Sequence, residues 1–316
     1  MNLLAEISTS NNNRFKIVKG FIGAFRLMHF LPVITVTTMG AITAILSLKG
    51  ESTFSEFFQN ISNGTIEIVP FIFLVLVVFF QSAFLGIQND YIDREFDIKY
   101  GKSKAIADGW VSEKFALGLA IAFYILFTGF SIGLGFWSVT GFWGILYVQG
   151  SNLIGMSYNI LAKHRPYSIV PHMIGQPLIP VYAWLTFGGF QLKYIWIVPI
   201  LFFIAFPAHM ANEIPDFDFD IQFGNRNFAV FLGKKLATIV YWIAIAIIEV
   251  ILVVIFFLYS LNLWVFIGII SLSILIAGVA IFLLWKREWN TDIQIFNVVT
   301  ACLGVQAIGF FILFLI

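Results

Sequence analysis

Residues 67–101 read EIVPFIFLVLVVFFQSAFLGIQNDYIDREFDIKYG, an apolar run that continues directly into a cluster of acids. A helix that crosses a bilayer needs about 20 predominantly apolar residues, and Glu67–Gln88 supplies them. Beyond that run, oxygen-bearing side chains recur at every fourth position, at Asn89, Asp93 and Asp97. Residues four apart share one face of a helix. The stretch therefore predicts a spanning helix that carries an acidic stripe out of the membrane.

The whole chain has the composition of a polytopic membrane protein. Hydrophobic residues make up 60% of the 316 and charged residues only 11%, whereas about a quarter of the residues in a soluble domain are charged. The sequence predicts an all-α bundle of about nine transmembrane helices, which forms one membrane-embedded domain over residues 1–316 with a polar N-terminal segment at residues 1–20. The nine apolar stretches are Phe21–Leu48, Glu67–Gln88, Lys114–Phe136, Thr140–Leu161, Ile169–Gly188, Tyr194–Ala211, Lys235–Ser260, Leu263–Trp285 and Ile295–Ile316.

The basic residues are distributed unevenly between the loops that join these stretches. With nine spans, one side of the membrane collects most of the lysines and arginines, while the other has only Lys49 and Lys193 together with several glutamates. Cytoplasmic loops of membrane proteins carry an excess of Lys and Arg. We therefore expect an integral, multi-pass membrane protein whose N-terminus and acidic-motif loops are cytoplasmic.

The acidic motif occurs twice in the chain. Asn89–Gly101 reads NDYIDREFDIKYG, and Asn212–Gly224 reads NEIPDFDFDIQFG. Both contain Asn and two Asp at intervals of four, and eight of the 17 acids in the chain fall within them. Four predicted helices separate the two motifs, so both should emerge on the same side. This pattern predicts a parallel repeat of two four-helix halves plus one further helix.

Two acidic stripes that face each other across a central cavity repel one another unless cations lie between them. Mg²⁺ prefers carboxylate oxygens together with substrate phosphates, so the pattern predicts a Mg²⁺–diphosphate site. Pro215 fits only the first turn of a helix, which predicts that the second stripe begins on a new short helix. The alternative is that the acids are solvated, or neutralised by Arg94 and Lys99. The predicted metal ligands are Asn89, Asp93, Asp97, Asn212, Asp216 and Asp220.

Basic residues near the motifs are candidates for binding the substrate, because a phosphoryl group needs cations as well as metal. The alternative is that they only set the topology. Arg26 lies in the first apolar stretch, where a charge is costly unless it faces a cavity or reaches the interface. Glu249, in the seventh stretch, either packs in protonated form or lines the cavity. The predicted substrate-binding residues are Arg26, Lys102, Lys104, Lys163, Arg165 and Arg226.

The segment Asn89–Asp97 resembles the first aspartate-rich motif of the UbiA-type intramembrane prenyltransferases, and Asp216 with Asp220 resembles their second. The resemblance implies a helical bundle around a cavity, with Mg²⁺ as cofactor and a prenyl diphosphate as donor. It implies that Asp90, Asp93, Asp97, Asp216 and Asp220 are catalytic, with Asp90 as a base or orienting group. Asn212 is added from the internal repeat alone. The loop at Lys104–Gly109 departs from the family pattern, which leaves the acceptor subfamily open.

We therefore expect an enzyme that transfers a prenyl group from a polyprenyl diphosphate to an aromatic or lipid acceptor, of quinone-precursor or archaeal-lipid type. Its other expected partner is membrane lipid, and no nucleic acid is expected. One alternative is a UbiA-like membrane terpene cyclase, which would share the metal site and lack a second substrate. A second alternative is a cation or lipid-phosphate transporter, but transporter sites lie near the bilayer midplane, whereas these motifs follow the ends of helices.

Overall fold

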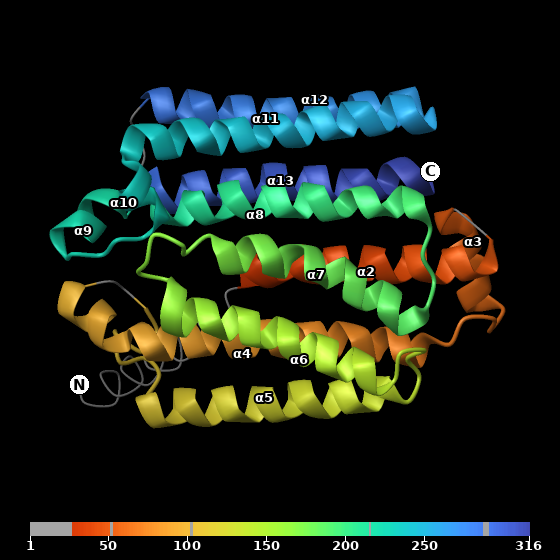
Figure 1. Ribbon diagram of the computed structural model, residues 1–316, viewed down its shortest axis with the longest axis horizontal. Coiled ribbons are helices and arrows are strands. Elements are labelled where there is room, and N and C mark those ends of the chain that lie inside the picture. Colours follow the sequence, from red (N-terminus) through yellow and green to blue (C-terminus); the bar gives the residue numbers. More distant parts are fainter. Residues whose placement is uncertain (1–26, 51–52, 102–103, 215, 287–290) are drawn as a thin grey trace, which may run out of the picture.

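The computed structural model describes residues 27–50, 53–101, 104–214, 216–286 and 291–316. Within these segments the fold is helical, with no strand, and the long helices lie side by side in one bundle (Figure 1). The elements are α2 (Leu27–Lys49), α3 (Phe54–Ser62), α4 (Ile68–Tyr100), α5 (Glu113–Gly135), α6 (Phe142–Ser157), the π-helix η1 (Tyr158–Ala162), α7 (Val170–Phe187), the 3₁₀ turn η2 (Leu192–Trp196), α8 (Ile197–Glu213), α9 (Phe217–Gln222), α10 (Phe228–Leu232), α11 (Lys234–Tyr259), α12 (Leu263–Lys286) and α13 (Thr291–Leu315).

Each of the nine predicted apolar stretches overlaps one of the long helices. Among the described residues, four segments are long and apolar enough to cross a bilayer. The number of such segments is five if α2 and α3, which are bent by 80° relative to each other, form one broken span. The four segments are Ile68–Tyr100, Glu113–Gly135, Leu192–Glu213 and Lys234–Tyr259. The predicted helical membrane fold is thus confirmed, and the count of nine spans stays a prediction.

The order of neighbouring helices repeats in the two halves of the chain. In the first half α2 packs against α4, α4 against α5 and α5 against α6. In the second half α7 packs against α8, α8 against α11 and α11 against α12. The first helices of the two halves, α2 and α7, pack against each other, while α13 packs against α12, α8 and α2. This arrangement matches the predicted two four-helix halves plus one helix.

Small side chains allow α2 and α7 to approach closely at the centre of the bundle. A Cβ at Gly40 would lie 3.2 Å from both the Pro180 Cα and the Ala183 Cβ. Helix contacts within membranes commonly use such small residues, because they bring two backbones together. A polar contact supports the same pair of helices, since Trp184 Nε1 donates to Thr43 Oγ1 at 3.2 Å.

Glu249 on α11 joins three helices in the second half. Its Oε1 accepts hydrogen bonds from the Ser273 hydroxyl of α12 and, at 2.6 Å, from Gln306 Nε2 of α13. Glu249 is absent from the residues that line the cavity described below. The sequence left two roles for Glu249, packing between helices and lining the cavity. The structure favours packing between helices.

Both acidic motifs lie at one end of the bundle, whereas α3 and the C-terminus lie at the other (Figure 1). The 33 residues of α4 form a helix about 50 Å long at 1.5 Å per residue, which exceeds the hydrocarbon core of about 30 Å. The surplus lets the last turns of α4, which carry the first motif, extend beyond the apolar layer.

Candidate active site

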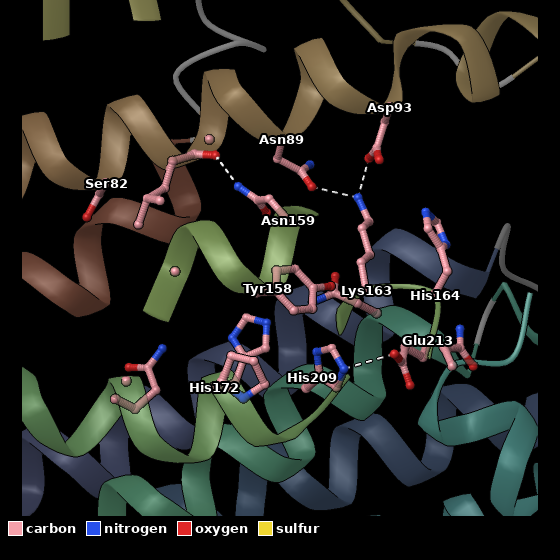
Figure 2. A pocket seen from close by; sticks show the side chains of 18 of the residues that line it. Ser82, Asn89, Asp93, Tyr158, Asn159, Lys163, His164, His172, His209 and Glu213 are labelled. Carbon is pink, nitrogen blue, oxygen red and sulfur yellow. Dashed lines mark hydrogen bonds and ion pairs between the residues drawn. The ribbon is translucent and has the colours of Figure 1, made fainter. Parts of the chain in front are cut away.

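A cavity of about 740 Å³ lies at the end of the bundle that carries the two motifs. Its wall is built by α4 from the first half of the chain and by α8 and α9 from the second, with η1 and α7 between them. Figure 2 shows Asn89 and Asp93 on one wall and His172, His209 and Glu213 on the opposite wall. All six predicted metal ligands line this cavity: Asn89, Asp93, Asp97, Asn212, Asp216 and Asp220.

The first stripe forms one continuous face of α4, as its spacing predicts. Its two carboxylates, Asp93 and Asp97, are buried, and so is the neighbouring Asp90. The ammonium group of Lys104 lies 3.2 Å from Asp93 and 2.8 Å from Asp97, and 3.4 Å from Asp90. Lys163 donates to Asn89 Oδ1 at 2.6 Å and also pairs with Asp93. Two lysines from different loops therefore neutralise the stripe.

The alternative prediction, that Arg94 neutralises this stripe, is wrong. The Arg94 guanidinium instead contacts the Tyr91 carbonyl at 2.8 Å, Glu95 at 3.2 Å and Glu113 at 3.0 Å. Arg94 follows Asp93 directly, and adjacent residues of a helix point in different directions. Lys99 likewise lies over the ring of Tyr100.

The second stripe is split between two helices, as Pro215 predicts. α8 ends at Glu213, and α9 begins at Phe217 with Asp216 as its N-cap. Asp220 on α9 is buried, and its two carboxylate oxygens accept from Asn225 Nδ2 at 2.8 Å and Asn227 Nδ2 at 2.6 Å. These two asparagines, which also line the cavity, hold Asp220 in place and were missed from the sequence. The signal that could have identified them is their position in the loop directly after the second motif.

The two halves differ at the asparagine that opens each motif. Asn89 is buried and contacts Lys163. Asn212 is exposed, and its amide donates to the Ala208 carbonyl at 3.3 Å on the same helix. Asn212 therefore shares the cavity wall with Asn89 without sharing its contacts.

The π-helix η1 places three polar residues at the cavity. A π-helix widens the helical turn and often marks a functional site. Asn159 Nδ2 donates to the Leu85 carbonyl and to Gln88 Oε1, both at 3.0 Å, which ties η1 to α4. Tyr158, the first residue of η1, and Lys163, its C-cap, both line the cavity. No pattern in the sequence predicts this irregular turn, so Tyr158 was not among the predicted residues.

Aromatic residues at equivalent positions of the two motifs contact each other. The rings of Phe96 and Phe219 are 6.1 Å apart, and those of Tyr100 and Phe223 are 3.7 Å apart. Their numbering offset equals that between Asn89 and Asn212. These contacts join the end of α4 to α9 and hold the two motifs together at one end of the cavity.

With this geometry in place, comparison with known proteins identifies the family. The model of the UbiA prenyltransferase family matches residues 60–312. The chain belongs to the UbiA prenyltransferase family. A comparison with curated protein sequences gives no match.

Solved structures of UbiA homologues share the fold. A UbiA homologue from Aeropyrum pernix K1 in its apo form has 16% identity and a TM-score of 0.64 over 88% of this chain and 96% of that one. A UbiA homologue from Archaeoglobus fulgidus bound to DMAPP and Mg²⁺ has 18% identity and a TM-score of 0.61 over 92% and 99%. A digeranylgeranylglyceryl phosphate synthase has 16% identity and a TM-score of 0.58 over 94% and 98%. Membership of the UbiA family confirms two predictions: that the chain is an enzyme of the prenyltransferase class, and that it is a multi-pass membrane protein.

The predicted substrate-binding residues separate into three groups. Lys104 and Lys163 line the cavity and contact the first stripe. Arg165 and Arg226 are exposed and are not part of the cavity wall, so their roles stay predictions. Arg26 and Lys102 lie outside the described residues. Asp90, predicted as a base or orienting group, lies behind the wall in a small apolar recess with Ile106 and Val111.

The donor set of the first stripe fits the divalent cation that the UbiA family implies. Within the described part of the chain, no three His, Cys, Asp or Glu side chains already form a closed metal centre. Asp93 and Asp97 nevertheless direct carboxylate oxygens to the ammonium groups of Lys104 and Lys163. These are hard oxygen donors that already hold positive charge, which is the chemistry that Mg²⁺ requires.

Proposed function

We propose that this UbiA-family enzyme transfers a prenyl group, with Mg²⁺ as cofactor, from a polyprenyl diphosphate to an aromatic or lipid acceptor. One observation carries the proposal: oxygen donors from both acidic motifs and the cations of Lys104 and Lys163 line the same cavity. A diphosphate leaving group needs both kinds of group, because metal ions and cations share its charge. A Mg²⁺ complex of a prenyl diphosphate, DMAPP, is described for the A. fulgidus homologue.

The roles follow from the positions of the side chains. Asn89, Asp93 and Asp97 on one wall, with Asp216 and Asp220 on the other, would hold Mg²⁺, and the ion would supply positive charge to the diphosphate leaving group. Lys163 and Lys104, which line the same cavity, would donate charge-assisted hydrogen bonds to oxygens of the diphosphate. Asn225 and Asn227 fix the carboxylate of Asp220. Phe96 and Tyr158 also line the cavity, and aromatic rings there would stabilise an allylic cation.

The acceptor is proposed as an aromatic or lipid compound of the quinone-precursor or archaeal-lipid type. The similarity to a digeranylgeranylglyceryl phosphate synthase supports the lipid type. The motif resemblance supports the aromatic type.

The proposed function is tested with purified protein, labelled geranylgeranyl diphosphate, Mg²⁺ and a panel of acceptors. The label is expected to appear covalently on an acceptor, diphosphate release is expected to depend on that acceptor, and EDTA is expected to stop both reversibly. Complete diphosphate release without an acceptor, with a free hydrocarbon as product, would instead assign the cyclase reaction. Transport of ions across the membrane of vesicles, without any release of diphosphate, would exclude prenyl transfer and support the transporter alternative.

We also propose that the end of the bundle with the acidic motifs faces the cytoplasm, as the distribution of basic residues predicts. Cysteines introduced as Lys99→Cys and Gln222→Cys, both at exposed positions, are expected to react with a membrane-impermeant maleimide from the cytoplasmic side only. Gln59→Cys, on α3 at the opposite end, is expected to react only from outside. The native Cys302 is buried and serves as the unlabelled background. Labelling of all three positions from one side would contradict the topology.

A further inference from the structure

The second acidic motif contains a carboxylate that the proposed metal site does not use. Glu213 is buried, and it accepts hydrogen bonds from Ser168 Oγ at 2.7 Å and from the Ala229 backbone N–H at 3.0 Å. Its Oε1 also lies 2.8 Å from Nε2 of His209, one helical turn earlier on α8. Within the described part of the chain, His209 is the basic side chain that lies within ion-pair distance of Glu213.

We propose that His209 is a further catalytic residue, which takes up the proton that the acceptor loses when it is prenylated. Glu213 and Ser168 are its positioning residues. This inference rests on the proposed function, because it assigns the fate of a proton in that same transfer reaction. It goes beyond that proposal by naming a base on the wall opposite the first acidic stripe (Figure 2).

The contacts of His209 determine which ring nitrogen is available. An ionised carboxylate can only accept hydrogen bonds, so Nε2 of His209 carries the proton that faces Glu213. The neutral ring then has its lone pair on Nδ1. When Nδ1 takes a proton, the adjacent carboxylate stabilises the imidazolium that results. Ser168, which lies 3.1 Å from His209 Nε2 and accepts from the Phe228 N–H, helps to fix this orientation.

His209 is buried, and it belongs to the residues that line the cavity. His209 precedes Glu213 by four residues, which is about 6 Å along the helix axis, so it lies deeper in the bundle than Asp216 and Asp220. The diphosphate is held at the acidic stripes, and the reacting carbon and the acceptor must then lie on the deeper side. There His209 belongs to a cluster of rings, 4.6 Å from His172 and 5.6 Å from Tyr158, and all three residues line the cavity.

The proposed step balances without any further reactant. The bond between C1 of the prenyl group and the diphosphate oxygen breaks, and its electron pair leaves with the diphosphate. The attacking oxygen or ring carbon of the acceptor forms the new bond to C1 with its own electron pair. The proton that this atom then loses passes to Nδ1 of His209, and the charge of the imidazolium is matched by Glu213.

The titratable groups around His209 come from three elements. Glu213 lies on its own helix α8, His172 on α7 and Tyr158 on η1. Lys163 and His164 also line the cavity. A base must be unprotonated to act, so the rate of transfer is expected to fall on the acid side of the pH profile.

A structural role is the competing explanation, because Glu213 also joins α8 to the start of α10 through Ala229. His209→Gln separates the two roles. The glutamine amide can still donate to Glu213, but it has no basic nitrogen. We expect kcat for prenyl transfer to fall about 100-fold, as is typical for removal of a general base, and the acid-side fall in rate to become shallower, because only the carboxylates of the proposed metal site then need to be unprotonated. Binding of geranylgeranyl diphosphate with Mg²⁺ and the Tm are expected to match the wild type.

The assay uses geranylgeranyl diphosphate with 4-hydroxybenzoate and geranylgeranylglyceryl phosphate as probe acceptors. Glu213→Gln should lower kcat less and keep the acid-side fall, because His209 remains. Asp218→Asn, at an exposed carboxylate paired with Lys234, is the matched control and should behave as the wild type.

Two results would overturn the role of His209 while leaving the proposed function intact. One is a His209→Gln enzyme with the kcat and pH profile of the wild type. The other is a variant whose Tm and donor binding fall together with its rate, which would assign a structural role. A wild-type protein that binds the donor but prenylates neither probe would overturn the proposed function, and this inference with it.

Discussion

Asp93→Asn is expected to lower Mg²⁺-dependent turnover on the order of a thousandfold, because charge stabilisation of a leaving group is among the largest single contributions to catalysis. Asp93 is buried, lies on the cavity wall and pairs with both Lys104 and Lys163. The substitution keeps the size of the side chain and removes its charge. Turnover is measured as the label transferred from geranylgeranyl diphosphate at saturating Mg²⁺.

The chain provides a matched control for this prediction. Asp218 belongs to the second motif but is exposed and pairs with Lys234, away from the cavity wall. Asp218→Asn removes the same charge from the same end of the bundle and is expected to leave turnover within about twofold, as surface pairs contribute little. Equal losses in the two variants would point to a general effect of negative charge and would contradict a specific role for Asp93.

Lys163→Gln is expected to change two affinities in opposite directions. In the structure Lys163 holds Asn89 and Asp93, so a metal that binds alone must displace its ammonium group. Removal of that group should strengthen the binding of Mn²⁺, used as a probe for Mg²⁺, about tenfold. The variant should bind inorganic pyrophosphate with Mg²⁺ about 10- to 100-fold more weakly, because a charge-assisted hydrogen bond contributes roughly 1.5–3 kcal/mol.

Both affinities can be measured without turnover, by electron paramagnetic resonance for Mn²⁺ and by calorimetry for pyrophosphate. Lys234→Gln is the control, since Lys234 is also a lysine paired with an aspartate, but on the surface. It should change neither affinity. A Lys163→Gln variant that loses affinity for both Mn²⁺ and pyrophosphate would contradict this prediction. It would show that Lys163 supports the structure of the site and does not exchange its contacts with the first stripe for contacts with the diphosphate.

Regular features of the sequence predicted the fold and the location of the candidate site. The apolar run before Asn89 and the four-residue spacing after it predicted α4 with its acidic face, because both depend on helix geometry alone. Pro215 predicted the break between α8 and α9 for an equally local reason. The internal repeat predicted that both motifs would reach one end of the bundle, which the cavity wall confirms.

Features that depend on distant contacts were not predictable in the same way. Whether Arg94 or Lys163 neutralises Asp93 is decided by how η1 packs against α4, and nothing in the local sequence of either segment specifies it. The same holds for Asn225 and Asn227, whose contacts with Asp220 depend on how the loop folds back. The ring cluster at His209 requires α7, α8 and η1 to meet, and the sequence shows only isolated polar residues there.

The layout of α4 also affects how a donor would reach the enzyme. A prenyl diphosphate is an amphiphile that dissolves in the bilayer with its chain among the lipid tails and its diphosphate at the aqueous boundary. α4 has the same order of polarity, with apolar turns followed by Asn89, Asp93 and Asp97. The bilayer would therefore present the donor at the depth and in the direction that the ligands require. Encounter becomes a two-dimensional search among pre-aligned molecules, and much of the orientational entropy of binding is lost before the donor meets the protein.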